Sequence, residues 1–153
     1  EPVLEEIRKH NGVLSIMHVC RGNWTTDESV LLQGAYDKLG KFFDALDLDM
    51  LALEFSTPRA GEVEKLFSNN FLDTRVMLGF GCVNPRSEVI ETPEEIVSRV
   101  EELLQFLPPE RIWLNPDCGF ATFANRPVST MEIIDKKLAR LNEAKNTLRN
   151  LYD

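Results

Sequence analysis

The sequence predicts an α/β fold of four parallel strand–helix units. Aliphatic and β-branched residues form four short apolar runs, at residues 13–19, 50–55, 75–81 and 112–115. The runs are nearly continuous rather than alternating, which is typical of parallel strands covered on both faces. Their starts lie 37, 25 and 37 residues apart. These spacings fit right-handed crossovers between parallel strands, which take roughly 30 residues.

Helical patterns occupy the segments between the apolar runs. Residues 61–68 predict a short helix, and a polar helical stretch opens the chain. Residues 27–46 predict a longer helix, because their apolar side chains recur at helical spacing and form one stripe. The stripe consists of Leu31, Leu32, Ala35, Leu39, Phe42, Phe43 and Leu46.

Two capping boxes mark the starts of the last two predicted helices. In a capping box, a Ser or Thr and a Glu three residues later satisfy the free backbone N–H groups of the first turn. Thr92 and Glu95 form one such pair, and the helix that follows is expected to end before Pro108. Ser129 and Glu132 predict a second box at the start of the C-terminal helix.

Composition predicts a single acidic unit over residues 1–153. Lys and Arg number 17 against 25 Asp and Glu, which gives a formal net charge of −8 and a pI near 4.8. Such a charge gives no electrostatic reason to bind nucleic acid or an anionic membrane. No apolar run approaches the roughly 18 residues that a membrane span needs. We therefore expect no nucleic-acid partner and no membrane association.

The cysteines and the length constrain the setting of this unit. Cys20, Cys82 and Cys118 are odd in number and widely spaced, which indicates reduced thiols in the cytoplasm rather than a disulfide scaffold. The chain opens at Glu1 without an initiator Met, and we expect it to be a portion of a longer protein. An eight-stranded β/α barrel takes about 250 residues. The pattern alone therefore allows a small open sheet or half of a barrel.

Three of the four predicted strands end in side chains that bind metals. The carboxyl ends of parallel strands form the ligand-binding side of α/β folds. His18 and Cys20 lie two positions apart at the end of the first strand, so their side chains point the same way. Glu54 ends the second strand, and Cys118 follows the fourth. Imidazole, two thiols and a carboxylate form a donor set that suits zinc.

Each of these residues also has a purely structural interpretation when it is taken alone. A histidine at a strand end often only hydrogen-bonds within the fold, and a free cysteine commonly behaves as a small buried hydrophobe. The combination favours the metal site, because an unpaired carboxylate ending an apolar strand is costly to bury. Cys82, among glycines and valine, keeps the structural interpretation because no fifth ligand is required, and His10, on a polar helix end, is expected to be a solvated surface residue.

The strand-end motifs H-V-C, L-A-L-E-F-S and N-P-D-C-G together resemble the C-terminal catalytic part of the cobalamin-independent methionine synthase family. The resemblance runs from residue 13 to residue 149, and H-V-C-R-G-N is most similar to the shorter relatives in that family. It implies that the four strands are the C-terminal half of a TIM (β/α)8 barrel. It also implies a zinc site made by His18, Cys20, Glu54 and Cys118.

The resemblance further implies methyl transfer to a substrate thiol. A thiol with a pKa of about 8.5 is mostly protonated at neutral pH, whereas a zinc-bound thiol is deprotonated and nucleophilic. In the family the thiol is homocysteine and a folate carries the methyl group. Two thiolates and one carboxylate leave the zinc site with a net negative formal charge. This charge is expected to keep the substrate sulfur nucleophilic.

Arg86 and Asp117 are the predicted catalytic residues. Arg86 lies in the loop G-C-V-N-P-R-S, near the place where the synthase has a histidine that handles a proton. Asp117 adjoins Cys118 and, with Asn115, is a candidate for supporting the metal ligands. The shorter relatives include enzymes that transfer epoxyalkanes to coenzyme M. The departure at Arg86 therefore keeps open an alternative, zinc-dependent alkyl transfer to another thiol such as coenzyme M.

Two further alternatives differ in class from thiol alkylation. A half-barrel without activity would bind a partner through its open sheet edge, because unpaired edges and apolar surface favour pairing. The expected protein partner is another copy of the chain or an N-terminal half-barrel. In the catalytic interpretation, a small-molecule thiol and a methyl donor are expected to bind as well. A hydrolase using zinc-bound hydroxide is disfavoured, because two thiolates and a carboxylate leave zinc a poor Lewis acid.

Overall fold

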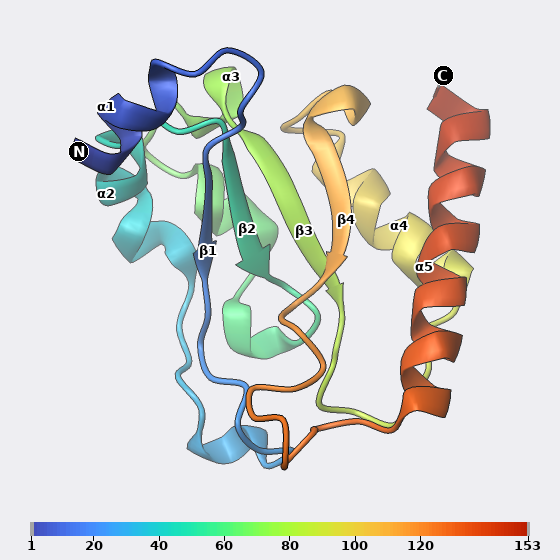
Figure 1. The fold of residues 1–153 in the computed structure, drawn as a ribbon. Helices are drawn as coiled ribbons and strands as arrows, with labels where there is room; N and C mark the ends of the chain where they lie inside the picture. The colour runs from blue at the N-terminus through green and yellow to red at the C-terminus, as the bar shows by residue number, and fades with distance from the viewer. Residues whose placement is uncertain (1, 153) are drawn as a thin grey trace.

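A computed structural model describes residues 2–152 of the chain and contains a single parallel sheet (Figure 1). The strands are β1 (Ile16–Val19), β2 (Met50–Glu54), β3 (Met77–Val83) and β4 (Ile112–Pro116). Their spatial order is β1-β2-β3-β4, and every neighbouring pair is parallel. The sheet confirms the predicted α/β class with four parallel strands. Each helix within residues 2–152 is too short or too polar to cross a membrane.

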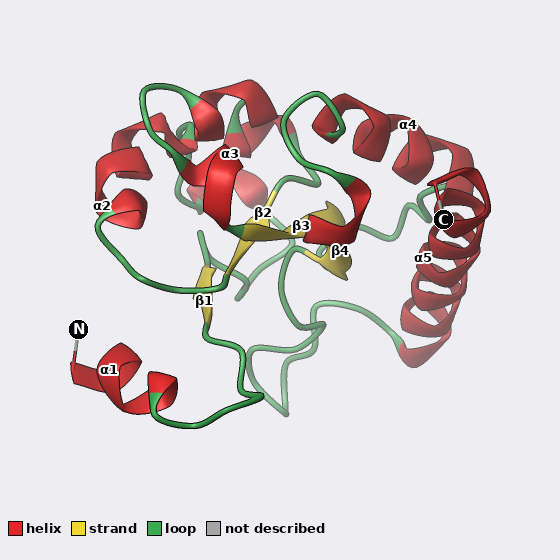
Figure 2. Cartoon of the chain, turned by 90° about the horizontal axis from the view of Figure 1, so that it is seen from above, coloured by secondary structure: helices red, strands yellow, loops and turns green. Residues whose placement is uncertain are grey.

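Most of the helices cover one face of this sheet. The helices are α1 (Pro2–Arg8), α2 (Gly40–Asp44), α3 (Leu72–Arg75), α4 (Pro93–Leu103) and α5 (Met131–Tyr152). Short 3-10 turns lie at Glu28–Val30, Tyr36–Leu39, Pro58–Ala60, Val63–Phe67 and Pro109–Arg111. Figure 2 shows α2, α3 and α4 on one side of the strands and α5 beyond β4. Loops and the short helix α1 lie away from this helix layer, so the longer helices pack against one face only (Figure 2).

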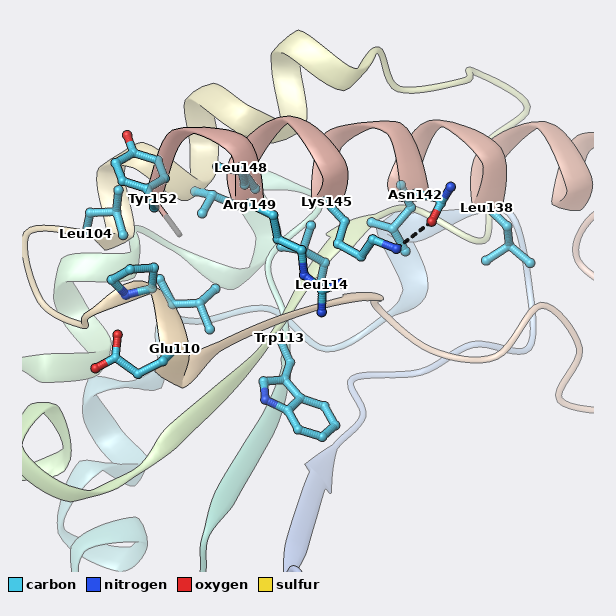
Figure 3. Close-up of a pocket in the computed structure, with 14 residues that line it drawn as sticks. Leu104, Glu110, Trp113, Leu114, Leu138, Asn142, Lys145, Leu148, Arg149 and Tyr152 are labelled. Atoms are coloured by element: carbon cyan, nitrogen blue, oxygen red, sulfur yellow. Dashed lines mark hydrogen bonds between the residues drawn. The ribbon is translucent and has the colours of Figure 1, made fainter.

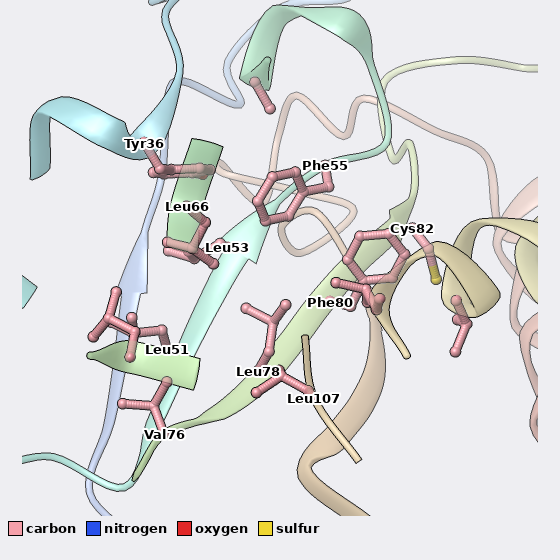
Figure 4. Close-up of a cluster of buried hydrophobic side chains, with 14 of the residues drawn as sticks. Tyr36, Leu51, Leu53, Phe55, Leu66, Val76, Leu78, Phe80, Cys82 and Leu107 are labelled. Carbon is pink, nitrogen blue, oxygen red and sulfur yellow. The ribbon is translucent and has the colours of Figure 1, made fainter. Parts of the chain in front are cut away.

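The hydrophobic core lies between the sheet and these helices (Figure 4). Leu51, Leu53, Leu78 and Phe80 point from β2 and β3 towards the helices and are at most 1% exposed. Aromatic rings continue the core towards the carboxyl ends of the strands, where the ring centres of Phe55 and Phe80 are 5.6 Å apart. This packing fixes the positions of the two central strands. It therefore also fixes the strand ends that carry the predicted site.

The opposite face of the sheet carries no comparable layer among the described residues. Strand register places His18 beside Ala52 and Ala52 beside Gly79, so these positions share a face. Ile16 and Trp113 lie on that face and are 53% and 48% exposed. In a parallel sheet covered on both sides, such side chains would be buried. The uncovered face is the one from which His18 and Glu54 project.

The helix expected over residues 27–46 does not form as one element, and that prediction is wrong. The segment contains two 3-10 turns and the short helix α2. Gly34 adopts a φ of +136°, which interrupts any helix at that position. The Leu32 and Gly34 carbonyls accept hydrogen bonds from the Arg59 and Arg21 guanidinium groups. Long-range contacts thus replace the local hydrogen bonds that helical periodicity predicted.

One capping box forms and the other does not. The Glu95 N–H donates to the Thr92 hydroxyl at 3.2 Å and the Thr92 N–H to the Glu95 carboxylate at 2.7 Å, so the first box is confirmed. The C-terminal helix begins at Met131 instead of directly after Ser129. Thr130 caps it, since its hydroxyl and carbonyl accept from the first turn, and Glu132 pairs with Lys136. The predicted box at Ser129 and Glu132 is therefore wrong.

The remaining local predictions are partly right. Residues 61–68 contain a 3-10 turn, Val63–Phe67, where a short helix was expected. The third strand starts at Met77, because residues 72–75 form the helical turn α3. The first strand starts at Ile16, three residues later than predicted. The carboxyl ends of the strands fall within two residues of their predicted positions, because the third strand ends at Val83 rather than at residue 81.

Candidate metal centre

Four potential metal ligands meet at the carboxyl ends of three strands. His18 lies in β1, Cys20 directly follows that strand, Glu54 is the last residue of β2 and Cys118 follows β4 by two residues. One donor atom from each residue lies within 4.8 Å of all the others. The structure therefore brings together the four residues that the sequence singled out. Cys118 is separated from His18 by 100 positions, so strand order rather than chain proximity creates this cluster.

Cys118 lies at the centre of the cluster. Its Sγ is 3.3 Å from His18 Nε2 and 3.3 Å from Cys20 Sγ. The same thiol donates a hydrogen bond to Glu54 Oε1 at 3.1 Å. Glu54 is buried, Cys118 is partly buried, and His18 and Cys20 are exposed. The cluster is thus anchored in the fold on one side and open to solvent on the uncovered face.

A backbone contact orients the His18 ring. Its Nδ1 is 2.9 Å from the Ala52 carbonyl oxygen, so the Nδ1–H donates to that oxygen. The lone pair then remains on Nε2, the nitrogen that faces Cys118. Metal-binding histidines typically donate their other ring N–H to a carbonyl or carboxylate, which fixes the tautomer and the ring direction. This arrangement leaves Nε2 of His18 oriented to bind a metal in the cluster.

Contacts with three other residues hold the buried Glu54 in place. The Arg21 backbone N–H donates to Oε1 at 2.8 Å, and Arg59 Nη2 donates to Oε2 at 3.0 Å. The Glu54 N–H donates to the Tyr36 hydroxyl at 3.0 Å. Because a buried carboxylate needs hydrogen bonds or a counter-charge, these partners make the position tolerable. They also leave Oε1 turned towards the cluster.

The chemistry of the cluster fits a divalent cation. Burial, followed by hydrogen bonds and charge from Glu54 and Cys20, raises the pKa of the Cys118 thiol. The Cys118 thiol is therefore harder to ionise in this position unless a cation balances its negative charge. A divalent metal reverses this effect, because it deprotonates coordinating thiols. One nitrogen, two sulfurs and one oxygen form a donor set that zinc accepts.

Arg86 and Asp117 form a buried ion pair beside the cluster. Arg86 Nη2 donates to Asp117 Oδ2 at 2.8 Å, and both side chains are at most 1% exposed. Burial alone would lower the pKa of Arg86, but charges and hydrogen bonds from Asp117 and Glu28 outweigh it and raise the pKa. Arg86 is therefore a permanent cation in this fold. A direct catalytic role for either residue stays a prediction.

Asp117 ties the end of β4 to the end of β2. Its Oδ1 accepts the N–H groups of Phe55 and Ser56 at 3.1 Å and 2.9 Å. A Cβ at Gly81 would lie 2.7 Å from that same oxygen, so only glycine allows this approach. The bonds place the residues after Glu54 against the residue before Cys118. Asp117 thus supports the ligand geometry, whereas the Asn115 side chain donates to the carbonyl of neighbouring Pro116.

Several residues around the cluster carried no signal in the sequence. Arg59 and Tyr36 reach Glu54 from segments that have no metal-binding motif, and Glu28 joins Arg86 to Asn84. Their roles depend on how the loops that follow β1 and β2 fold over the strand ends. Periodicity cannot predict that path. The one feature of the sequence that could have indicated such a contact is the position of Arg59, five residues after Glu54.

Cys82 is buried and His10 is exposed, and neither belongs to the four-residue cluster. Cys82 is fully buried, and burial raises the pKa of its thiol to about 12. His10 is exposed and lies 3.9 Å from the Glu6 carboxylate.

At pH 8 in folded, metal-free protein, iodoacetamide is expected to label exposed Cys20 and to spare Cys82. The thiolate is the reactive form, and the raised pKa of buried Cys82 keeps its thiol protonated at that pH. Peptide mass mapping measures this, and labelling of Cys82 before unfolding would contradict its burial.

Comparisons with known proteins agree on one family. A family model described as the catalytic domain of cobalamin-independent synthase matches residues 17–136, a range that contains all four candidate ligands. An uncharacterised protein, YxjG, from Bacillus subtilis is 34% identical over 107 residues, which cover 69% of this chain and 27% of that protein. A methionine synthase from Thermococcus kodakarensis is 28% identical over 132 residues, covering 81% of this chain and 34% of the enzyme.

A solved structure has the same fold. A B12-independent methionine synthase from Shewanella sp. W3-18-1, determined in complex with selenomethionine, superposes with a TM-score of 0.70 at 17% identity. The match covers 92% of this chain and 40% of that chain. The fold class predicted from the sequence, four parallel units of a TIM barrel, is confirmed. The chain spans between about a quarter and two fifths of the length of the relatives it matches.

Proposed function

The chain belongs to the cobalamin-independent methionine synthase family, and from this premise we propose that it binds zinc and activates a substrate thiol for S-methylation. The observation that supports the proposal is the convergence of His18, Cys20, Glu54 and Cys118, whose donor atoms lie within 4.8 Å of one another. Homocysteine is the proposed thiol, because relatives of this chain are methionine synthases. The methyl donor is proposed to be a folate.

The residues of this chain prepare the site for that chemistry. Zinc supplies deprotonation of a bound thiol at neutral pH. His18 offers Nε2, because its Nδ1–H is bound to the Ala52 carbonyl. Glu54 offers Oε1, because Arg59 holds Oε2. Asp117 holds the two strand ends together, so that Cys118 and Glu54 keep their separation.

We also propose that a second half-barrel completes this site. The uncovered sheet face exposes Ile16 and Trp113, and β4 is an edge strand of the described sheet. Beside that edge, β4, α4 and α5 enclose a groove of about 640 Å³ lined by Leu114, Leu138 and Leu148 (Figure 3). The matched segments cover only 27% and 38% of two relatives, so an N-terminal half-barrel is the proposed occupant. Residues 1–153 would then form one unit of a longer cytoplasmic enzyme.

Thiol coordination tests the proposed activity directly. Cobalt(II) replaces zinc in such sites and absorbs visible light when thiolates coordinate it. Adding homocysteine to the cobalt-loaded chain is expected to change this absorption in a saturable way, whereas homoserine, which has a hydroxyl in place of the thiol, is expected to change nothing. A response to coenzyme M but not to homocysteine would favour the alternative acceptor. A metal-loaded chain that responds to neither thiol would contradict thiol binding by this half-barrel on its own.

A further inference from the structure

Arg59 is a buried cation directly behind one of the candidate ligands. It lies in the 3-10 turn Pro58–Ala60, five residues after Glu54. Its side chain is 5% exposed and that of Glu54 is 2% exposed. Nη2 donates to Glu54 Oε2 at 3.0 Å. Among the four residues of the cluster, Glu54 is the one that forms an ion pair in the described part of the chain.

The two oxygens of Glu54 have different surroundings. Oε2 faces Arg59, whereas Oε1 faces Cys118 at 3.1 Å and also accepts the Arg21 N–H at 2.8 Å. Rotation of the carboxylate would break the Arg59 contact. The arginine therefore leaves one oxygen, Oε1, available on the side of the cluster. A charged partner of this kind also offsets the negative charge of a carboxylate in a buried position.

The loop between β1 and β2 holds Arg59 itself in place. Nη1 donates to the carbonyl oxygens of Leu32 at 3.1 Å and Arg21 at 3.4 Å. In return, Arg21 Nη1 donates to the Arg59 carbonyl at 3.0 Å. Within the described residues, Nε has no hydrogen-bond partner and lies 3.6 Å from the Glu28 carboxylate. The guanidinium is thus clamped with Nη2 directed at Glu54, even though one of its polar atoms stays unsatisfied.

We propose that Arg59 is a positioning residue of the metal centre, which holds Glu54 as a single-oxygen ligand and sets the charge of the donor set. The inference rests on the zinc site of the proposed function. Residues that orient metal ligands through hydrogen bonds typically change metal affinity by about 10- to 100-fold when they are replaced. Arg59 is expected to act on zinc only through Glu54, because among the described residues its side chain forms no hydrogen bond or ion pair with another member of the cluster.

A double-mutant cycle with zinc affinity as its readout tests this role. Arg59→Gln is expected to weaken zinc binding about 10- to 100-fold, measured by competition with a chromophoric chelator. In the Glu54→Gln background, the same change is expected to alter affinity by less than about threefold, because the group that Arg59 positions is gone. Arg59→Lys keeps the charge without the planar fork and is expected to fall between wild type and Arg59→Gln.

Arg111→Gln is the matched control for loss of a partly buried arginine. Arg111 donates to the carbonyl oxygens of Asp73 and Val76, at the opposite ends of the strands from the cluster, and forms no hydrogen bond or ion pair with a candidate ligand in the described residues. Its replacement is expected to lower the unfolding midpoint and leave zinc affinity within about twofold of wild type. If Arg59→Gln fails to fold, Arg59→Lys decides the matter, and unchanged affinity in that variant would overturn the proposal.

The outcomes separate this inference from the proposed function. A wild-type chain that takes up no zinc would overturn the proposed function and the role of Arg59 with it. Zinc binding in wild type with equal affinity in Arg59→Gln would overturn only the role of Arg59. If Arg59→Gln weakens zinc binding equally in wild type and in the Glu54→Gln background, Arg59 supports the fold without acting through Glu54, and the proposal is overturned.

Discussion

Replacing Cys118 with serine is expected to remove stoichiometric zinc binding. Cys118 Sγ lies within 3.3 Å of a donor atom from each of the other three residues. Its loss therefore removes the central donor atom of the cluster. Structural zinc sites gain about 10–16 kcal/mol from four ligands, and a hydroxyl is a far weaker zinc ligand than a thiolate. We therefore expect affinity to fall at least about 100-fold. Elemental analysis of protein purified without added metal measures the zinc content.

Cys82→Ala provides the control for the loss of a cysteine. Cys82 is fully buried in the core and belongs to no part of the cluster. Its replacement is expected to lower stability by about 1 kcal/mol, because a small cavity replaces the sulfur, while zinc content stays near one per chain. A Cys118→Ser chain that retains the wild-type zinc content would contradict the assigned site. Loss of zinc in both variants would point to unfolding instead of ligand loss.

The strands and the ligand cluster could be predicted because both depend on simple geometric rules. Continuous apolar runs define parallel strands, and positions two apart on a strand project together, which paired His18 with Cys20. Parallel strands place their carboxyl ends on one side, so Glu54 and Cys118 could be added from sequence positions far away. In the folded chain, the register of the paired strands brings the four residues together at one edge of the sheet.

The path of the β1–β2 loop could not be predicted in the same way. Apolar residues of this loop do recur at helical spacing. However, the Leu32 carbonyl accepts a hydrogen bond from Arg59, 27 positions away, and the Gly34 carbonyl accepts one from Arg21, 13 positions away. Local propensity is a weak prior when tertiary hydrogen bonds compete for the same backbone groups. For the same reason no sequence pattern indicated that Tyr36 and Arg59 would meet Glu54. Residues that hold the candidate ligands in place were thus harder to predict than the candidate ligands themselves.

Replacing Asp117 with alanine is expected to lower the free energy of unfolding more than replacing Cys82 or Glu132 with alanine. Asp117 and Arg86 are both almost fully buried and pair at 2.8 Å. Removing Asp117 leaves the buried Arg86 paired only with Glu28, whose side chain is partly exposed, and the loss of one partner of a buried pair typically costs about 3–5 kcal/mol. The Ser56 N–H would lose its acceptor at the same time, and the Phe55 N–H would keep only the Gly81 carbonyl oxygen. Urea unfolding at pH 7 measures the difference, and the chain is expected to unfold at a markedly lower midpoint.

The same variant separates a structural role of Asp117 from a catalytic one. Glu132→Ala breaks an exposed ion pair with Lys136 and is expected to leave the urea midpoint nearly unchanged. If Asp117→Ala behaves like this control yet abolishes thiol activation, Asp117 acts in the chemistry, as its place beside Cys118 predicts. If stability and zinc affinity fall together, the ion pair acts by holding the ends of β2 and β4. The second outcome is expected, because the hydrogen bonds of Asp117 join the segments that carry Glu54 and Cys118.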